Sequence, residues 1–114
     1  MPSPASSIGR AELAELLASG VPVRILDVRR TPAFEKNPVV LPGALRVPPD
    51  TLGAWAADSS AERSVPLVVY CVYGHEVSQT AAVELEALGF TVRFLAGGIS
   101  EWQSSGGATS AGDA

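Results

Sequence analysis

Short apolar segments alternate with segments of helical spacing along most of this 114-residue chain, and this alternation strongly constrains the fold. The spacing of apolar residues predicts strands at residues 23–28, 44–46, 67–70 and 91–95. Helices are predicted at residues 11–19, from Thr31 to Pro38, from Asp50 through Trp55, at residues 78–88 and after Gly98. Short apolar strands that alternate with helices indicate a parallel sheet covered on both faces. The predicted class is therefore α/β, with residues 67–70 as the central strand.

Length and composition indicate one globular domain. With 46% apolar residues, a net charge of −4 and no basic cluster, the chain is not expected to bind nucleic acid. No apolar run approaches the roughly 20 residues of a membrane span, and residues 1–7 lack the features of a signal peptide. We therefore expect a cytoplasmic protein without a membrane partner. The predicted organisation is a loose tail at residues 1–6, a domain at 7–103 and a flexible Gly/Ser-rich tail at 104–114.

Cys71 is the only cysteine, and it follows the central strand directly, a few residues before a predicted helix. Unpaired backbone N–H groups and the positive end of a helix dipole stabilise an anion at such a position. The thiolate is the reactive form of cysteine, so this position favours chemistry. The alternative is a small buried side chain without reactivity. One cysteine excludes an internal disulfide, and neither a metal nor a cofactor is expected.

Asp27 and Arg29 lie at the end of another predicted strand. Ligands of parallel sheets bind beyond the carboxyl ends of the strands, so these residues are expected near Cys71. An Asp–Arg pair at a strand end can tie neighbouring loops together, which is the structural interpretation. In the alternative interpretation, Arg29 or Arg30 supplies positive charge to a pocket.

Four segments, in this order, resemble motifs of the rhodanese-like family of single-domain sulfurtransferases. They are Leu-Asp-Val-Arg at 26–29, Leu-Pro-Gly-Ala at 41–44 followed by Val-Pro at 47–48, Tyr-Cys at 70–71, and Leu-Ala-Gly-Gly-Ile-Ser-Glu-Trp at 95–102. The resemblance covers about residues 7–103. It implies a three-layer fold, in which a small, mostly parallel five-stranded sheet has helices on both faces.

The same resemblance implies the chemistry of a sulfurtransferase. Cys71 would accept a sulfane sulfur from a small donor such as thiosulfate, hold it as a persulfide, and pass it to a thiol or to cyanide. The thiol acceptor could belong to a partner protein. Backbone N–H groups after the cysteine would bind the anionic thiolate and persulfide. The substrate-binding residues would be those of the loop: Val72, Tyr73, Gly74, His75, Glu76 and Val77.

This loop departs from the usual family pattern in two ways. Alignment of the following helix gives it one extra residue, a length similar to the Cys-x5-Arg loop of dual-specificity phosphatases and arsenate reductases. Val77 stands where those enzymes have arginine, which disfavours phosphate chemistry. Arsenate reduction through an internal disulfide is excluded by the single cysteine. A low-turnover sulfur carrier, or a sensor of persulfides or oxyanions, remains the main alternative to an enzyme.

Single residues of the loop also have open roles. His75 is either a titratable substrate-binding group or a solvated side chain, and Tyr73 is a candidate for the pocket entrance. Glu76 is expected to bond backbone amides or a cation rather than to act as a base. Gly74 is expected to permit a backbone angle that other residues resist.

Overall fold

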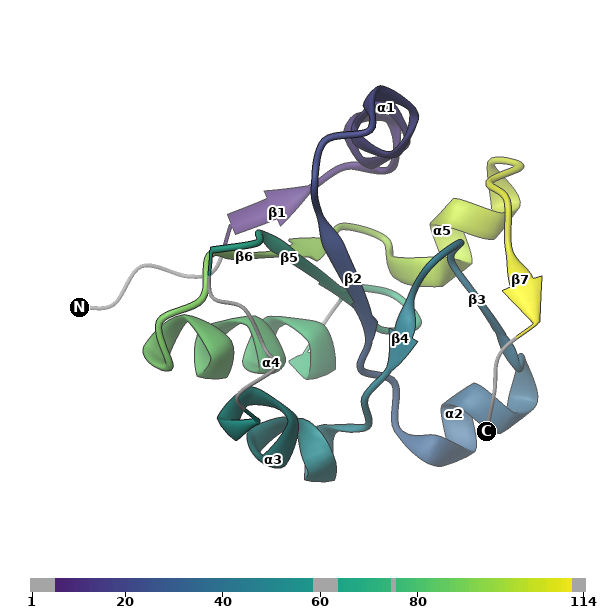
Figure 1. Cartoon of the computed structure of the whole chain (residues 1–114). Helices are drawn as coiled ribbons and strands as arrows, with labels where there is room; N and C mark the ends of the chain where they lie inside the picture. The colour runs from purple at the N-terminus through teal and green to yellow at the C-terminus, as the bar shows by residue number, and fades with distance from the viewer. Residues whose placement is uncertain (1–5, 59–63, 75, 112–114) are drawn as a thin grey trace.

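The computed structural model describes residues 6–58, 64–74 and 76–111 and contains a five-stranded sheet in which all strands are parallel (Figure 1). The strand order is β1 (Ser6–Ile8), β6 (Val92–Leu95), β5 (Leu67–Tyr70), β2 (Arg24–Asp27) and β4 (Leu45–Arg46). The α/β class, the five-stranded sheet and the central position of residues 67–70 are confirmed. β1 was not predicted, because three residues are too short to show an alternating pattern.

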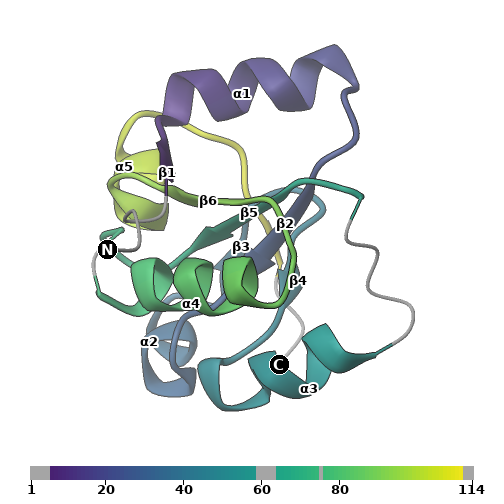
Figure 2. The ribbon, with the colours of Figure 1, turned by 90° about the vertical axis from the view of Figure 1, so that its left-hand side faces the viewer.

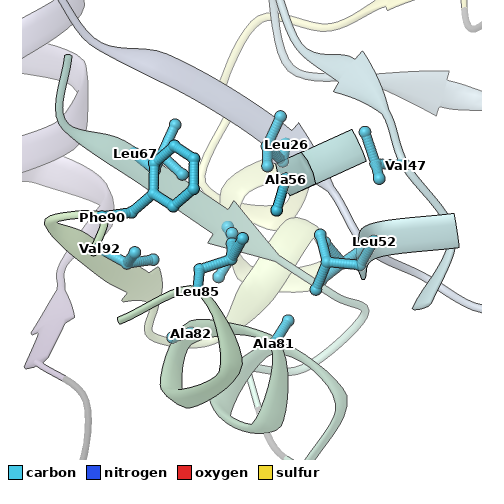
Figure 3. Packing of buried hydrophobic residues seen from close by; sticks show 12 residues of the cluster. Leu26, Val47, Leu52, Ala56, Leu67, Ala81, Ala82, Leu85, Phe90 and Val92 are labelled. Atoms are coloured by element: carbon cyan, nitrogen blue, oxygen red, sulfur yellow. The ribbon is translucent and has the colours of Figure 1, made fainter. Parts of the chain in front are cut away.

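The side chains of β5 alternate between the two faces of the sheet, as the geometry of a strand requires. Leu67 and Val69 pack against α3 (Leu52–Ala57) and α4 (Glu76–Ala87), in the cluster shown in Figure 3. Val68 and Tyr70 face α1 (Arg10–Ser19) and α5 (Gly98–Ser104). Figure 2 shows these two pairs of helices on opposite sides of the sheet. The chain thus forms three layers around a central strand whose residues are all buried.

The helix ends follow the sequence signals only in part. Gly20 ends α1 in the left-handed conformation, as a glycine after a helix is expected to do. α2 (Thr31–Lys36) begins at Thr31, where the predicted helix starts, but its N-cap Arg30 makes no side-chain capping bond. Asp50 lies within a 3-10 turn, η1 (Pro49–Thr51), and α3 begins only at Leu52. Neither helix start has a side-chain capping bond.

The structure differs from the prediction of loose ends at Ser6 and residues 104–111. Ser6 lies in β1 and pairs with Arg93. After α5, the indole Nε1 of Trp102 donates a hydrogen bond of 2.7 Å to the Ala108 carbonyl. β7 (Ser110–Ala111) then pairs antiparallel with β3 (Val39–Val40). Small polar residues give no periodic signal, but distant partners order this segment; residues 1–5 and 112–114 lie outside the described part.

No helix in the described part of the chain is long and apolar enough to cross a bilayer.

Candidate active site

Cys71 follows β5 at the carboxyl end of the sheet, and α4 begins at Glu76. The helix therefore starts two residues before the predicted position at residue 78. Glu76 and Val77, predicted as loop residues, belong to the first turn of α4. The apolar pattern missed this turn because Glu76 is exposed, although a carboxylate at a helix start interacts favourably with the dipole. His75 lies outside the described residues.

The thiol of Cys71 lies beside a buried hydroxyl. Cys71 is 6% exposed, and its Sγ is 3.2 Å from the Oγ of Ser78, which is fully buried in α4. A hydroxyl at this position can accept from the thiol and can donate to a thiolate. Ser78 was not among the predicted site residues. Its signal was present, because Ser78 shares the buried helical stripe of Ala81, Ala82 and Leu85.

The backbone after Cys71 is held by the start of α5. The carbonyl oxygens of Cys71 and Val72 accept hydrogen bonds of 3.0 and 2.9 Å from the N–H groups of Ile99 and Ser100. Gly98 makes this approach possible, since it has φ +60° and a Cβ there would lie 2.4 Å from both carbonyl oxygens. The Gly-Gly pair at residues 97–98 is therefore part of the support of the Cys71 loop.

Gly74 packs closely against the backbone that leads into α5. It has φ +74°, and a Cβ would lie 2.6 Å from the Leu95 carbonyl oxygen and 2.7 Å from the Gly97 nitrogen. The side-chain amide of Gln79 donates a hydrogen bond of 3.0 Å to the Gly74 carbonyl. Only glycine fits both the left-handed backbone and this spacing.

A pocket of about 290 Å³ lies over Cys71. Four residues of the predicted loop line it, together with Cys71 and three residues at the end of β2 and in α2: Val72, Tyr73, Glu76, Val77, Cys71, Arg29, Arg30 and Ala33. Tyr73 is 60% exposed, and Gly74 is buried. Arg30 is exposed and forms no ion pair with any residue that the structure describes.

Asp27 and Arg29 form a buried ion pair next to this pocket. The Arg29 guanidinium Nη2 is 2.6 Å from Asp27 Oδ2, and both side chains are fully buried. Arg29 also donates hydrogen bonds to the carbonyls of Asn37 and Val39, at 2.9 and 2.6 Å. It thereby ties the end of β2 to the segment between α2 and β3. Asp27 neutralises the charge of Arg29, whereas Arg30 has no ion-pair partner within the part of the chain that the structure describes.

Tyr70 joins the same network from the central strand. Its hydroxyl donates a hydrogen bond of 3.1 Å to Asp27 Oδ2 and accepts one of 3.2 Å from the Leu41 N–H. Burial raises the pKa of the Tyr70 phenol well above its ordinary value of 10, and the negative charge of Asp27 adds to the shift. Tyr70 therefore stays neutral and acts as a structural link between strands.

Within the described residues, no three His, Cys, Asp or Glu side chains gather in a group that could hold a metal ion.

The domain has a parallel sheet covered by helices on both faces, and its cysteine lies in the loop between the central strand and a helix. These two features define its class. The chain matches the family model of the Rhodanese-like domain over residues 10–105. It therefore belongs to the rhodanese-like domain family. Among the curated proteins, none matches this sequence.

Solved structures share the fold at modest sequence identity. The Alr3790 protein from Anabaena sp. is 33% identical, with a TM-score of 0.79 over 92% of this chain and 80% of that one. A thiosulfate sulfurtransferase from Pseudomonas aeruginosa is 23% identical, with a TM-score of 0.80 over 96% of this chain and 21% of that one. The RPA3614 protein from Rhodopseudomonas palustris, called a possible tyrosine phosphatase, is 24% identical, with a TM-score of 0.78 over 93% of this chain and 85% of that one. The last two likenesses concern the fold alone.

Proposed function

We propose that this protein is a sulfurtransferase that carries sulfane sulfur on Cys71. The observation that carries the proposal is the position of the thiol. Cys71 lies at the end of the central strand, opens onto a pocket of about 290 Å³ and has the Ser78 hydroxyl 3.2 Å from its sulfur. Membership of the rhodanese-like domain family supports the same reaction class.

The proposed first step forms a persulfide. The Cys71 thiolate attacks the sulfane sulfur of thiosulfate, a new S–S bond forms, and sulfite leaves with the electron pair of the broken S–S bond. In the second step, cyanide or an acceptor thiolate attacks the outer sulfur of the persulfide. The Cys71 thiolate then leaves with the electron pair of that bond, and neither step needs an external oxidant or reductant.

Two side chains would assist these steps. The Ser78 hydroxyl would donate to the thiolate, both before the attack and as the leaving group forms. Arg30, a cation on the pocket wall with no ion-pair partner among the described residues, would attract the anionic donor. A thiol that must stay reduced between turnovers suits a reducing compartment, so we assign the protein to the cytoplasm.

The decisive experiment measures the intact mass of the protein after incubation with thiosulfate, and then thiocyanate after cyanide is added. We expect a gain of one sulfur atom, its removal by cyanide, and repeated turnover. Cys71→Ser should show neither the mass gain nor thiocyanate. If no sulfur donor adds a sulfur atom to the wild-type protein, the proposal is wrong. Labelling without turnover would instead favour the sulfur-carrier or sensor function.

Phosphatase chemistry is the weaker alternative, although one structural neighbour is called a possible tyrosine phosphatase. Val77 lines the pocket at the position where a phosphatase loop has arginine, and it also packs against the core under α4. Without a guanidinium, the loop lacks bidentate recognition of phosphate. Hydrolysis of p-nitrophenyl phosphate by the wild type and by Val77→Arg tests this point. We expect no hydrolysis by the wild type and a weak gain at most in the variant.

A further inference from the structure

A second hollow adjoins the pocket over Cys71. It measures about 140 Å³ and lies between α4 and the segment of η1 and α3. The two hollows share Arg30, Glu76 and Val77 as lining residues, so they meet along the first turn of α4. Figures 1 and 2 both show α3 beside α4 on one face of the sheet. A molecule whose sulfur reaches Cys71 can therefore extend along α4 into the second hollow.

The second hollow is lined by more negative than positive side chains. Glu76, Thr80 and Glu84 are spaced four residues apart on one face of α4, and all three line the second hollow. Eight residues of helix place Glu84 about 12 Å beyond Glu76 along the axis. Neither glutamate forms an ion pair with a residue that the structure describes. With Arg30 as its one lining cation among the described residues, the second hollow has an excess of negative charge.

The rest of the second hollow suits an aliphatic chain. Its wall includes the side chains of Leu52 and Ala81, which belong to the core cluster under α4, and the ring of Pro49. Apolar walls with a few placed polar groups are the usual form of a small-ligand site. A methylene chain that ends in an ammonium group matches both the walls and the charge at the far end.

We propose that the second hollow selects the sulfur acceptor, and that this acceptor is a thiol compound that carries an ammonium group bound by Glu84. The inference rests on the proposed function, because it assumes that the Cys71 persulfide passes sulfur to a thiol. Arg30 remains at the shared wall, where it faces the anionic donor. Glu84 lines only the second hollow of the two, so it contacts only the part of a ligand that extends beyond the pocket over Cys71.

The test uses two peptide thiols that differ in one charge. The persulfide is loaded with thiosulfate, the protein is desalted, and the rate of sulfur transfer is measured against N-acetylated, C-amidated Cys-Gly-Lys and Cys-Gly-Glu. We expect a preference of about fivefold for the lysine peptide, the size expected for an exposed ion pair, mainly in KM. Because the charges are solvent-accessible, salt should reduce this preference.

The variants compare two glutamates of the same helix. Glu84→Gln should abolish the preference, and Glu84→Lys should reverse it in favour of the glutamate peptide. Glu86→Gln is the matched control, since Glu86 is exposed on α4 and lines neither hollow. This control should keep the preference of the wild type.

The outcomes separate this inference from the proposed function. If the wild-type persulfide forms and reacts with cyanide, but the two peptides react equally, the acceptor inference is wrong and the sulfurtransferase remains. The inference is also wrong if Glu84→Gln and Glu86→Gln change the peptide ratio equally. If no persulfide forms at all, the proposed function is wrong and the inference falls with it.

Discussion

Substitution of Gly98 by alanine should damage both the stability of the fold and the chemistry of Cys71. The added Cβ would lie 2.4 Å from the carbonyl oxygens of Cys71 and Val72. Both oxygens are backbone atoms and accept hydrogen bonds from the start of α5. They cannot rotate away as a flexible side chain would. The overlap with the added Cβ is removed only if α5 and the Cys71 loop move apart.

Two contributions determine how much Gly98→Ala lowers the free energy of unfolding. Alanine at φ +60° carries the cost of the left-handed conformation, about 1–2 kcal/mol. Overpacking against rigid neighbours adds about 1–3 kcal/mol. Gly98→Ala should therefore lower the free energy of unfolding by about 2–5 kcal/mol. Gly20→Ala is the matched control, because Gly20 has φ +76° with nothing within 4 Å of the added Cβ. In this variant, the free energy of unfolding should fall only by the cost of the left-handed conformation.

Urea unfolding, followed by the fluorescence of Trp55 and Trp102, measures both variants. Persulfide formation is then measured with thiosulfate at a temperature at which each variant is folded. We expect Gly98→Ala to react more slowly than the wild type and Gly20→Ala to react at the wild-type rate. Equal stability losses and equal rates in the two variants would refute the view that α5 holds the Cys71 loop.

Three further predictions concern the site and its frame. Asp27→Asn should lower the free energy of unfolding in urea by about 3–5 kcal/mol, because it leaves the buried Arg29 charge uncompensated. Its control, Glu12→Gln, breaks the exposed pair with Arg93 and should cost under about 1 kcal/mol. Similar losses in the two variants would contradict this reasoning. Ser78→Ala should slow persulfide formation about tenfold or more in stopped-flow assays, since a hydrogen bond to a charged sulfur is lost; an unchanged rate would exclude the proposed role of Ser78. Because the pKa of Tyr70 is raised in the folded state, its contribution to stability is complete below pH 10 and is lost as the pH rises above that value. Tyr70→Phe should therefore reduce the loss of stability in alkaline urea titrations, and an identical alkaline loss in the variant would count against this assignment.

Much of the frame could be predicted from local sequence. Residues 67–70 are apolar at every position, which indicates a strand buried on both faces, and the strand is central. The α1 segment has leucines at helical spacing, and the glycine that follows ends it in the left-handed conformation. Cys71 could be placed at a strand end because its neighbours on either side have patterns of different period.

Most elements of two or three residues could not be predicted in this way, although β4 was predicted as a strand at residues 44–46. β1, β3 and β7 are too short to show periodicity, and β7 forms through its backbone pairing with the distant β3. The first turn of α4 was also missed, since Glu76 is exposed and Val77 was assigned to the loop. Backbone pairing between distant segments leaves little trace in the composition of such short stretches.

The sequence by itself determined the alternation of the longer strands and helices, the parallel sheet and the place of the single cysteine at its carboxyl edge. These properties depend on residues close together in the chain. Only the tertiary structure decided which groups surround the thiol: Ser78 at 3.2 Å, the start of α5 against the Cys71 loop, and Arg30 on the pocket wall. The physical reason is that packing of α4, α5 and α2 around the same strand ends sets these contacts, and their partners are separated along the chain by up to several tens of residues.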